Sequence, residues 1–223
     1  MNWSDLGIAT LETLGMTFIS TVLAYVVGIP VGIILNVTSK NGVHPNRWIN
    51  LILGAIVNIL RSIPCMLLII ILLPLTRSIV GRGTGKWYTM LIPLFFATFP
   101  FVSRIVEQSL QEVPSTSIEA VRSMGASDFQ IVRKVLLAEA KPSLITGLTV
   151  TLINVIGYTS FASDFGAGGL ISSAFSYYYS HTGDYLSSAD IWVIILIVVV
   201  IVQLLQELGL YIARKTDKRR AKA

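Results

Sequence analysis

The chain has 223 residues, of which 53% are hydrophobic and only 13% are charged, and its net charge is +5. Soluble domains carry roughly 25% charged residues, so this composition excludes an ordinary soluble domain. Several uncharged apolar stretches reach the roughly 20 residues that a helix needs to cross a bilayer. We therefore predict an all-α integral membrane protein with a single domain over residues 1–223.

Five of these stretches are expected to form transmembrane helices. They lie at about residues 14–37, 49–75, 87–109, 143–163 and 191–206. The segment from Phe165 to Gly183 is also uncharged, but it is rich in Gly, Ser and Tyr. Because lipid does not tolerate irregular backbone, we expect this segment to form an irregular outer loop, either wholly outside or partly re-entrant, rather than a sixth span.

The second span contains a charge near its middle, at Arg61. A charge at the bilayer centre costs at least ~2.5 kcal/mol, so Arg61 should face protein or a wet cavity. Asn58 and Ser62 fall on the same side of the helix, and Pro64 favours a kink because it removes a backbone donor. Either these residues line a break in a translocation pathway, or Arg61 snorkels or pairs with a carboxylate such as Glu107 to fasten two helices.

Residues 111–141, between the third and fourth spans, form the longest charged segment and predict two short helices. Thr116 and Glu119 fit a capping box that opens the first helix after Pro114. Gly125 stands where that helix would close with a left-handed residue. The segment is therefore expected to be ordered, despite its polarity.

The second helix of this segment is expected to begin at another capping box, Ser127 with Gln130, and to continue towards Glu139. Its apolar residues share one face at spacing i, i+3 and i+7: Phe129, Val132 and Leu136. The pattern is typical of a helix–Gly–helix unit with an apolar face. Such a unit either docks on a soluble partner or lies on the lipid surface as an amphipathic connector.

The fourth span carries a stripe of polar and aromatic residues at spacing i, i+3, i+7 and i+10: Thr151, Asn154, Tyr158 and Phe161. A polar stripe in a membrane helix faces a neighbouring helix or a cavity. Either the stripe lines the translocation pathway, with Tyr158 and Phe161 as bulky candidates for an outer gate, or it serves ordinary helix packing.

Lysine and arginine are distributed unequally between the two sides that five spans define. Of the 17 such residues, Arg77, Arg82 and Lys86 lie on the side of the N-terminus, Arg61 lies within a span, and the other 13 lie on the opposite side. The positive-inside rule therefore places the N-terminus outside and the C-terminus in the cytoplasm. We interpret the basic C-terminal tail as an anchor at anionic lipid rather than a nucleic-acid site.

Glu119-Ala120, Gly125, Ile131 and the segment Leu136–Ala140 resemble the coupling loop of ABC importer permeases. The family pattern is roughly E-A-A, three residues, G, nine residues, I-x-L-P, and this chain departs from it at Val121 and at Ala138, where the family has Ala and Pro. The resemblance implies that this cytoplasmic segment docks on an ATPase. The residues that would make this contact are Glu119, Ala120, Arg122, Met124, Gly125 and Ala126.

A wider resemblance covers essentially the whole chain. The segments Asn58–Pro64, Ile131–Leu137, Gly157-Tyr158 and Gly166–Leu170 are similar to the permease of bacterial methionine importers. This implies a type I ABC importer permease fold in the bacterial inner membrane, with two permease copies, a cytoplasmic ATPase dimer that binds ATP–Mg, and a periplasmic or lipid-anchored binding protein. The cargo would be methionine, as both enantiomers or related derivatives.

This chain has no Walker sequence, so we expect no ATP hydrolysis, catalytic residue, cofactor or metal in it. Two other functions stay open. One is an ABC permease for another amino acid, because selection in this architecture lies largely in the external binding protein. The other is an ion-coupled secondary transporter, which would need acidic groups inside the spans, where only Glu107 is found.

Overall fold

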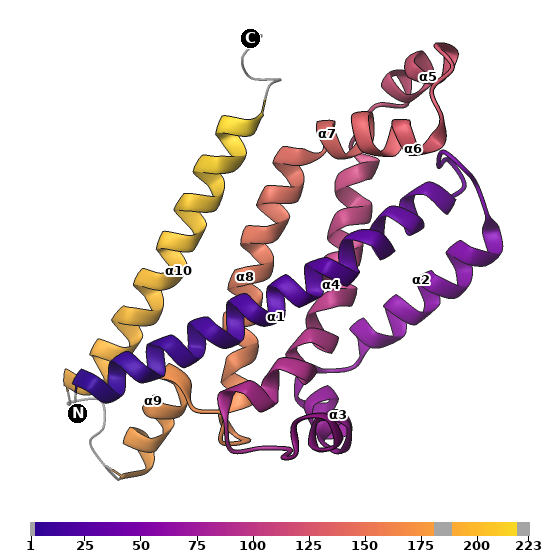
Figure 1. The fold of residues 1–223 in the computed structure, drawn as a ribbon. Helices are drawn as coiled ribbons and strands as arrows, with labels where there is room; N and C mark the ends of the chain where they lie inside the picture. Colours follow the sequence, from indigo (N-terminus) through magenta and orange to yellow (C-terminus); the bar gives the residue numbers. More distant parts are fainter. Residues whose placement is uncertain (1–2, 181–188, 218–223) are drawn as a thin grey trace. The chain divides into compact units, whose positions relative to one another are not determined.

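The structure is a computed structural model that describes residues 3–180 and 189–217, and every element in these residues is helical (Figure 1). The long helices are α1 (Trp3–Thr38), α4 (Leu91–Gln111), α8 (Lys141–Ser163) and α10 (Ala189–Thr216). The medium helices are α2 (Arg47–Ser62), α3 (Cys65–Val80) and α9 (Gly169–Ser180). The short elements are η1 (Trp87–Met90), α5 (Ser115–Ser123), α6 (Asp128–Ile131), the π-helical turn η2 (Val132–Leu136) and α7 (Leu137–Glu139).

Within the described residues, four helices are long and apolar enough to cross a membrane: α1, α4 with the preceding η1, α8 and α10. The broken pair α2 and α3 would make a fifth span. The all-α prediction is therefore confirmed, and the expected five spans agree with the helices found. The kink expected at Pro64 is a complete break, since α2 ends at Ser62 and α3 begins at Cys65.

Two of the spans are longer than the apolar stretches that predicted them. α1 begins at Trp3 rather than near residue 14, with Asp5 in its first turn, where a carboxylate stabilises the helix N-terminus. α10 continues to Thr216 rather than ending near residue 206, with Arg214 and Lys215 in its last turn, where cations are favoured. Hydropathy located the lipid-facing part of each helix but not its polar ends.

The chain forms two compact units, and the four long helices contribute residues to both. Unit 1 consists of Met1–Leu23, Ile63–Thr98 and Leu152–Gln206, and unit 2 consists of Ala24–Ser62, Phe99–Thr151 and Glu207–Ala223. In unit 2, α1 and α4 approach closely: a Cβ added at Gly32 would lie 2.5 Å from the carbonyl oxygen of Ser103. Small residues allow this kind of approach between membrane helices.

Unit 1 has a core of large apolar side chains from several helices. The fully buried members include Met16, Ile69, Met90 and Leu94, with Trp87 packed against them. The segment expected to be an irregular loop at 165–183 contains the twelve-residue helix α9, so that expectation is wrong for residues 169–180; residues 181–183 lie outside the described residues.

The start of α9 is stabilised by residues far away in the sequence, so the local Gly, Ser and Tyr content did not predict this helix. Its first backbone N–H groups donate to side chains of α1, Gly169 N to Glu12 Oε2 at 2.9 Å and Leu170 N to Thr13 Oγ1 at 2.9 Å. These contacts satisfy N–H groups that a helix start leaves without a partner. The helix is thus stabilised from a distant part of the chain, and its own Gly- and Ser-rich sequence carries little sign of it.

Candidate functional site

The segment from α5 to α7 forms the candidate coupling loop, and it differs at its start from the predicted structure. α5 begins at Ser115 with Pro114 in the N-cap position, and no side chain caps it. The capping box predicted for Thr116 and Glu119 is therefore wrong. Proline has a fixed φ near −65° that suits a helix entry, so the helix starts directly after Pro114 and Thr116 lies inside it.

The end of α5 agrees with the prediction. Gly125 has a φ of +82°, a left-handed conformation that side chains with a Cβ adopt at a cost. Its N–H donates to the carbonyl oxygen of Arg122 at 2.9 Å, and Ala126 N donates to that of Val121 at 3.3 Å. These bonds close α5 and turn the chain sharply towards α6, as in common helix C-caps.

The second capping box is confirmed at the start of α6. Ser127 Oγ accepts from the N–H of Gln130, and the Gln130 side chain accepts from the N–H of Ser127 at 3.0 Å. The predicted apolar face is correct at Leu136, which is buried, and at Val132, which is half-buried, but wrong at Phe129, which is 70% exposed, and Ile131 and Val135 are buried as well. From Val132 to Leu136 the chain winds as the π-helical turn η2, so the α-helical spacing used for the prediction does not apply there.

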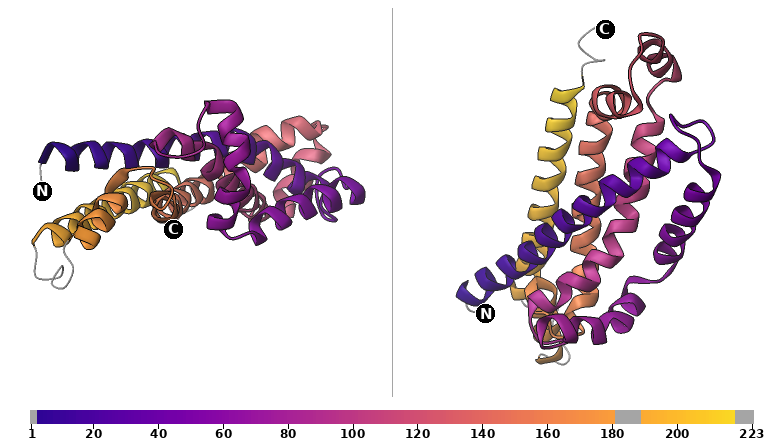
Figure 2. Two further views of the ribbon diagram at one scale, coloured as in Figure 1. Left: turned by 90° about the horizontal axis from the view of Figure 1, so that it is seen from below. Right: turned by 45° about the vertical axis from the view of Figure 1, so that its right-hand side comes forward.

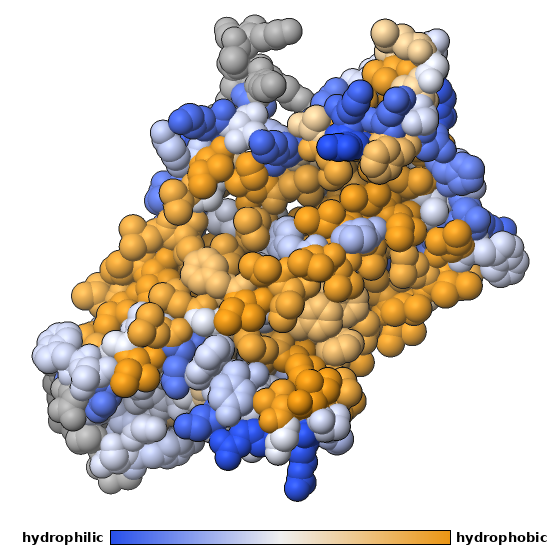
Figure 3. Space-filling model, in the orientation of Figure 1, coloured by the Kyte–Doolittle hydropathy of each residue, from blue (hydrophilic) through white to orange (hydrophobic). Residues whose placement is uncertain are grey.

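Polar contacts hold this loop against the connection between α1 and α2. Arg122 Nη2 donates to the carbonyl oxygen of Val43 at 2.6 Å and lies 3.5 Å from Asp128 Oδ1. His44 Nδ1 lies 3.3 Å from Asp128 Oδ2. Figure 2 shows the short helices beside this connection, and Figure 3 shows that hydrophilic residues gather there. Arg122 therefore fixes the loop to the rest of unit 2.

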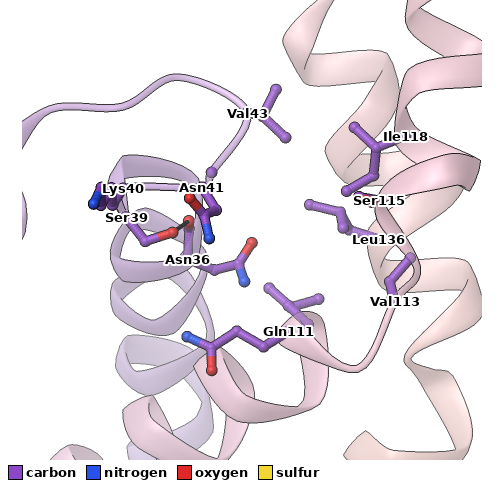
Figure 4. Close-up of a pocket in the computed structure, with 12 residues that line it drawn as sticks. Asn36, Ser39, Lys40, Asn41, Val43, Gln111, Val113, Ser115, Ile118 and Leu136 are labelled. Atoms are coloured by element: carbon purple, nitrogen blue, oxygen red, sulfur yellow. Dashed lines mark hydrogen bonds between the residues drawn. The ribbon is translucent and has the colours of Figure 1, made fainter.

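A hollow of about 490 Å³ separates the loop from the end of α1 (Figure 4). Its polar wall contains Asn36, Ser39, Asn41 and Gln111. Its apolar wall contains Val43, Val113, Ile118 and Leu136. Because apolar packing is interrupted here, the position of the loop depends strongly on the bonds of Arg122 and Asp128.

The remaining predicted docking residues lie on the outer surface of the loop. Glu119, Ala120 and Gly125 are exposed, Ala126 is half-buried, and Met124 is 85% exposed. Phe129 adds a second large exposed apolar side chain that the sequence analysis assigned to the wrong face. Exposed apolar side chains ringed by polar residues are typical of a surface that binds another protein.

The candidate pathway residues of α2 lie around its C-terminal end. Arg61 is exposed in the last turn, and within residues 3–180 and 189–217 its side chain forms no hydrogen bond or ion pair. The alternative pairing of Arg61 with Glu107 is wrong, because Glu107 pairs with Arg104 one turn earlier on its own helix. Ser62 Oγ donates to the carbonyl oxygen of Asn58, and Asn58 accepts from Arg104.

The predicted stripe of α8 meets different surroundings along its length. Thr151 is fully buried and donates to the carbonyl oxygen of Gly147 at 2.8 Å. Asn154 is half-buried, Tyr158 packs against the core of unit 1, and Phe161 is 40% exposed. Their role in a pathway stays a prediction.

The cluster of Arg104 with α2 was not predicted at all, although the i, i+3 spacing of Arg104 and Glu107 is a known pairing pattern.

Long apolar helices joined by an ordered, exposed loop define a membrane protein. The chain belongs to the family described as "Binding-protein-dependent transport system inner membrane component", whose model matches residues 28–218. It is 42% identical to the probable D-methionine transport system permease protein MetI of Pasteurella multocida (strain Pm70), over 97% of this chain and 98% of that protein. It is 46% identical to the D-methionine transport system permease protein MetI of Escherichia coli (strain K12), over 67% of this chain and 68% of that protein.

Solved structures of transporters agree with this family assignment. A structure of inward-facing conformations of the MetNI methionine ABC transporter is 38% identical, with a TM-score of 0.90 over 96% of this chain and 97% of that chain. An amino acid ABC transporter crystallised with histidines has a TM-score of 0.75 at 17% identity and shares the fold. The chain is thus a transport permease of the type I ABC importer fold, and ATP hydrolysis belongs to a separate subunit.

Proposed function

We propose that this chain is the permease subunit of an ATP-driven importer for methionine, acting as one permease domain over residues 1–223. The similarity to permeases named for D-methionine transport, over nearly the whole chain, carries this proposal. Two permease copies would form the pathway, a cytoplasmic ATPase dimer would bind ATP–Mg, and an external binding protein would deliver the substrate. In this arrangement the N-terminus lies outside and the C-terminus in the cytoplasm.

The loop between α4 and α8 is the proposed docking surface for the ATPase. Its exposed residues Glu119, Ala120, Met124 and Gly125 would contact the ATPase, while Arg122 and Asp128 fix the loop to unit 2. The turn at Gly125 and the capping box of Ser127 order the two short helices. Ordered helices transmit a displacement that a flexible linker would absorb. Closure of the ATPase dimer would therefore move the loop and, with it, the helices on either side.

The proposed pathway includes the polar residues near the break in α2 and those of the α8 stripe. On α2 and its break these are Asn58, Arg61, Ser62 and Pro64, and on α8 they are Thr151, Asn154, Tyr158 and Phe161. Support comes from the exposure of Arg61 and from the break itself, since a charge and interrupted backbone in a membrane helix require protein or water beside them. In this chain alone that surface is uncovered, and a second permease copy would enclose it.

The docking surface can be tested with Glu119→Lys and Gly125→Pro in the complex with the ATPase and the binding protein. The first change reverses an exposed charge. The second introduces proline, which cannot adopt the left-handed conformation of Gly125 or donate to the carbonyl oxygen of Arg122. We expect about a tenfold or larger loss of ATPase co-purification and of methionine uptake into liposomes. Amounts of permease in the membrane should not change.

Glu112→Lys is the matched control, because it reverses another exposed charge of the same segment just before α5. It should retain ATPase binding and uptake. Full activity of both docking variants would refute the coupling role. For the cargo, the ATPase rate is measured with the binding protein and either methionine enantiomer or another amino acid; stimulation only by another amino acid would refute methionine as the substrate.

A further inference from the structure

Arg104 of α4 forms three bonds in unit 2, and two of them join α4 to α2. Its Nη2 donates to the carbonyl oxygen of Gly54 at 3.1 Å and to Asn58 Oδ1 at 2.8 Å, both on α2. Its Nη1 donates to Glu107 Oε2 at 2.5 Å, and the two charged side chains are only 20% and 10% exposed. A planar guanidinium is suited to hold several acceptors in one geometry, which an ammonium group cannot reproduce.

The N-terminal side of α2 is connected to the loop by a different route. The segment just before α2 accepts a hydrogen bond from Arg122 at Val43, and its His44 lies beside Asp128 of α6. Asn50 in the second turn of α2 also donates to the carbonyl oxygen of Leu35 at 2.8 Å, which ties α2 to α1. α2 is therefore held near both of its ends, by the loop and α1 at its start and by Arg104 towards its end.

Arg104 lies on the helix that leads directly into the candidate coupling loop. α4 ends at Gln111, and Ser109 Oγ accepts from Ser143 Oγ at 3.0 Å, which closes the base of the loop onto α8. Close approach at Gly32 packs α4 against α1. α4 thus offers one route by which a displacement of the loop can reach α2, and among the described residues Arg104 forms the polar contacts between α4 and the C-terminal half of α2.

The far end of α2 can change direction without disrupting a helix. α2 ends at Ser62, Ile63 belongs to neither helix, and α3 starts after Pro64 with no side-chain cap. Hinges in proteins are a few such residues at element ends, where backbone angles can change. The proposed pathway residue Arg61 lies immediately before this break.

We propose that Arg104 is a positioning residue for transport, which makes α2 move together with the coupling loop and so changes the break beside Arg61. The inference rests on the proposed function of the chain as a permease. Apolar contacts between membrane helices have little preference over contacts with lipid, so they would not by themselves hold the two helices in register. The Arg104 bonds have a defined geometry and supply that preference.

The experiment uses the complete complex in liposomes, with methionine-loaded binding protein. The variants are Asn58→Ala, which removes one acceptor on α2, Arg104→Lys, which retains the charge, and Arg104→Gln. For each one, we measure co-purification of the ATPase, the basal ATPase rate, the stimulation of that rate and methionine uptake. Arg47→Gln is the matched control, since it removes a charge at the exposed start of α2 that forms no hydrogen bond or ion pair among the described residues.

We expect Arg104→Lys to retain the ATPase and its basal rate while stimulation and uptake fall by about threefold to tenfold, because only the coupling is weakened. Asn58→Ala should lower stimulation and uptake by a similar factor. Arg104→Gln should have the largest effect. The double variant Asn58→Ala with Arg104→Gln should lose no more than Arg104→Gln alone, because both changes remove one connection. Arg47→Gln should resemble the wild type.

Unchanged stimulation in Asn58→Ala and Arg104→Lys would overturn the proposal, and this result decides the matter even if Arg104→Gln fails to assemble. Additive losses in the double variant would also overturn it, because they would mean that Asn58 acts separately, for example only by lining the pathway. A wild-type complex that methionine does not stimulate would instead refute the proposed function. The two failures are therefore distinguishable.

Discussion

The two units use glycine in their helices in different ways. In unit 2, four helical glycines lie so close to a neighbouring helix that an added Cβ would be less than 3.0 Å from it: Gly28, Gly32, Gly147 and Gly209. In unit 1, a Cβ added at the helical Gly7 or Gly157 would meet nothing within 4 Å. These four positions of unit 2 are packed tightly, at Gly32 against backbone and at the other three against side chains, whereas in unit 1 a helical glycine with comparable packing is Gly169, where an added Cβ would lie 2.8 Å from Thr13 Oγ1.

This difference suits the two units to different tasks. At Gly32 of α1 there is no room for a side chain beside the backbone of α4, so these two helices have few alternative arrangements. The core of unit 1 contains Met16 and Met90 beside Ile69 and Leu94, and methionine adapts readily to changed surroundings. We therefore expect unit 2, which carries the candidate coupling loop, to tolerate changes in its helix contacts less readily than unit 1.

The largest effect is expected where the close contact of unit 2 is broken by a single methyl group. Gly32→Ala would place a Cβ 2.5 Å from the carbonyl oxygen of Ser103 and 2.6 Å from Val106 Cβ. Backbone cannot give way as a flexible side chain does, so α1 and α4 must separate. We expect a loss of about 2–3 kcal/mol of stability, measured as a lower thermal unfolding midpoint of the purified protein in detergent.

Gly7→Ala on the same helix is the matched control. It adds the same methyl group where nothing lies within 4 Å, and alanine is the better helix former by about 0.5–1 kcal/mol. Its unfolding midpoint should equal or exceed that of the wild type. If Gly32→Ala unfolds at the same temperature as Gly7→Ala, the contrast between the two units does not hold.

A smaller effect is expected at the start of α9 in unit 1, where polar groups rather than backbone contact fix the structure. A Cβ at Gly168 would lie within contact distance of the Glu12 carboxylate, which binds Gly169 N. Gly168 also has a φ of +76°, which costs a residue with a Cβ about 1 kcal/mol. Gly168→Ala should therefore lose about 2 kcal/mol, half of it through the lost hydrogen bond.

Gly81→Ala separates these two contributions. Gly81 has a similar φ of +81°, but a Cβ there would meet nothing within 4 Å. It should lose only the conformational part, about 1 kcal/mol. Hydrogen exchange of the first amides of α9 should accelerate in Gly168→Ala and not in Gly81→Ala. Equal exchange in both variants would contradict the capping role of Glu12.

The features that the sequence predicted correctly depend on neighbours in the chain. The apolar spans, the break near Pro64, the left-handed Gly125 and the box of Ser127 and Gln130 all follow from residues within a few positions of each other. Such features can be predicted because their physics is local. Even here one local prediction was wrong. The fixed φ of Pro114 starts α5 at Ser115, so Thr116 lies inside the helix and does not cap it.

The features that the sequence did not predict depend on distant residues. α9 begins on two side chains that lie 157 residues earlier, Glu12 and Thr13. Arg104 reaches Asn58, 46 residues away, while Arg61 was the more conspicuous charge because it interrupts an apolar run. The π-helical turn η2 leaves no recognisable pattern in a single sequence. The packing of distant helices decides which polar groups meet, so a local sequence pattern does not predict these pairs.

The smallest effect is expected at the turn of the coupling loop in unit 2. A substitution there tests whether side-chain capping stabilises this turn, as it stabilises the start of α9 in unit 1. Ser127→Ala removes the acceptor for Gln130 N, a long bond of 3.4 Å, so a loss at the low end of the usual range, about 0.5–1 kcal/mol, is expected. Thr116→Ala should cost nothing, because Thr116 does not cap α5. Hydrogen exchange of the amides at residues 128–131 reports the difference: it should accelerate only in Ser127→Ala. A larger effect of Thr116→Ala on the amides of α5 would mean that Thr116 caps this helix after all, and that the start of the loop resembles the predicted capping box rather than the proline-initiated helix.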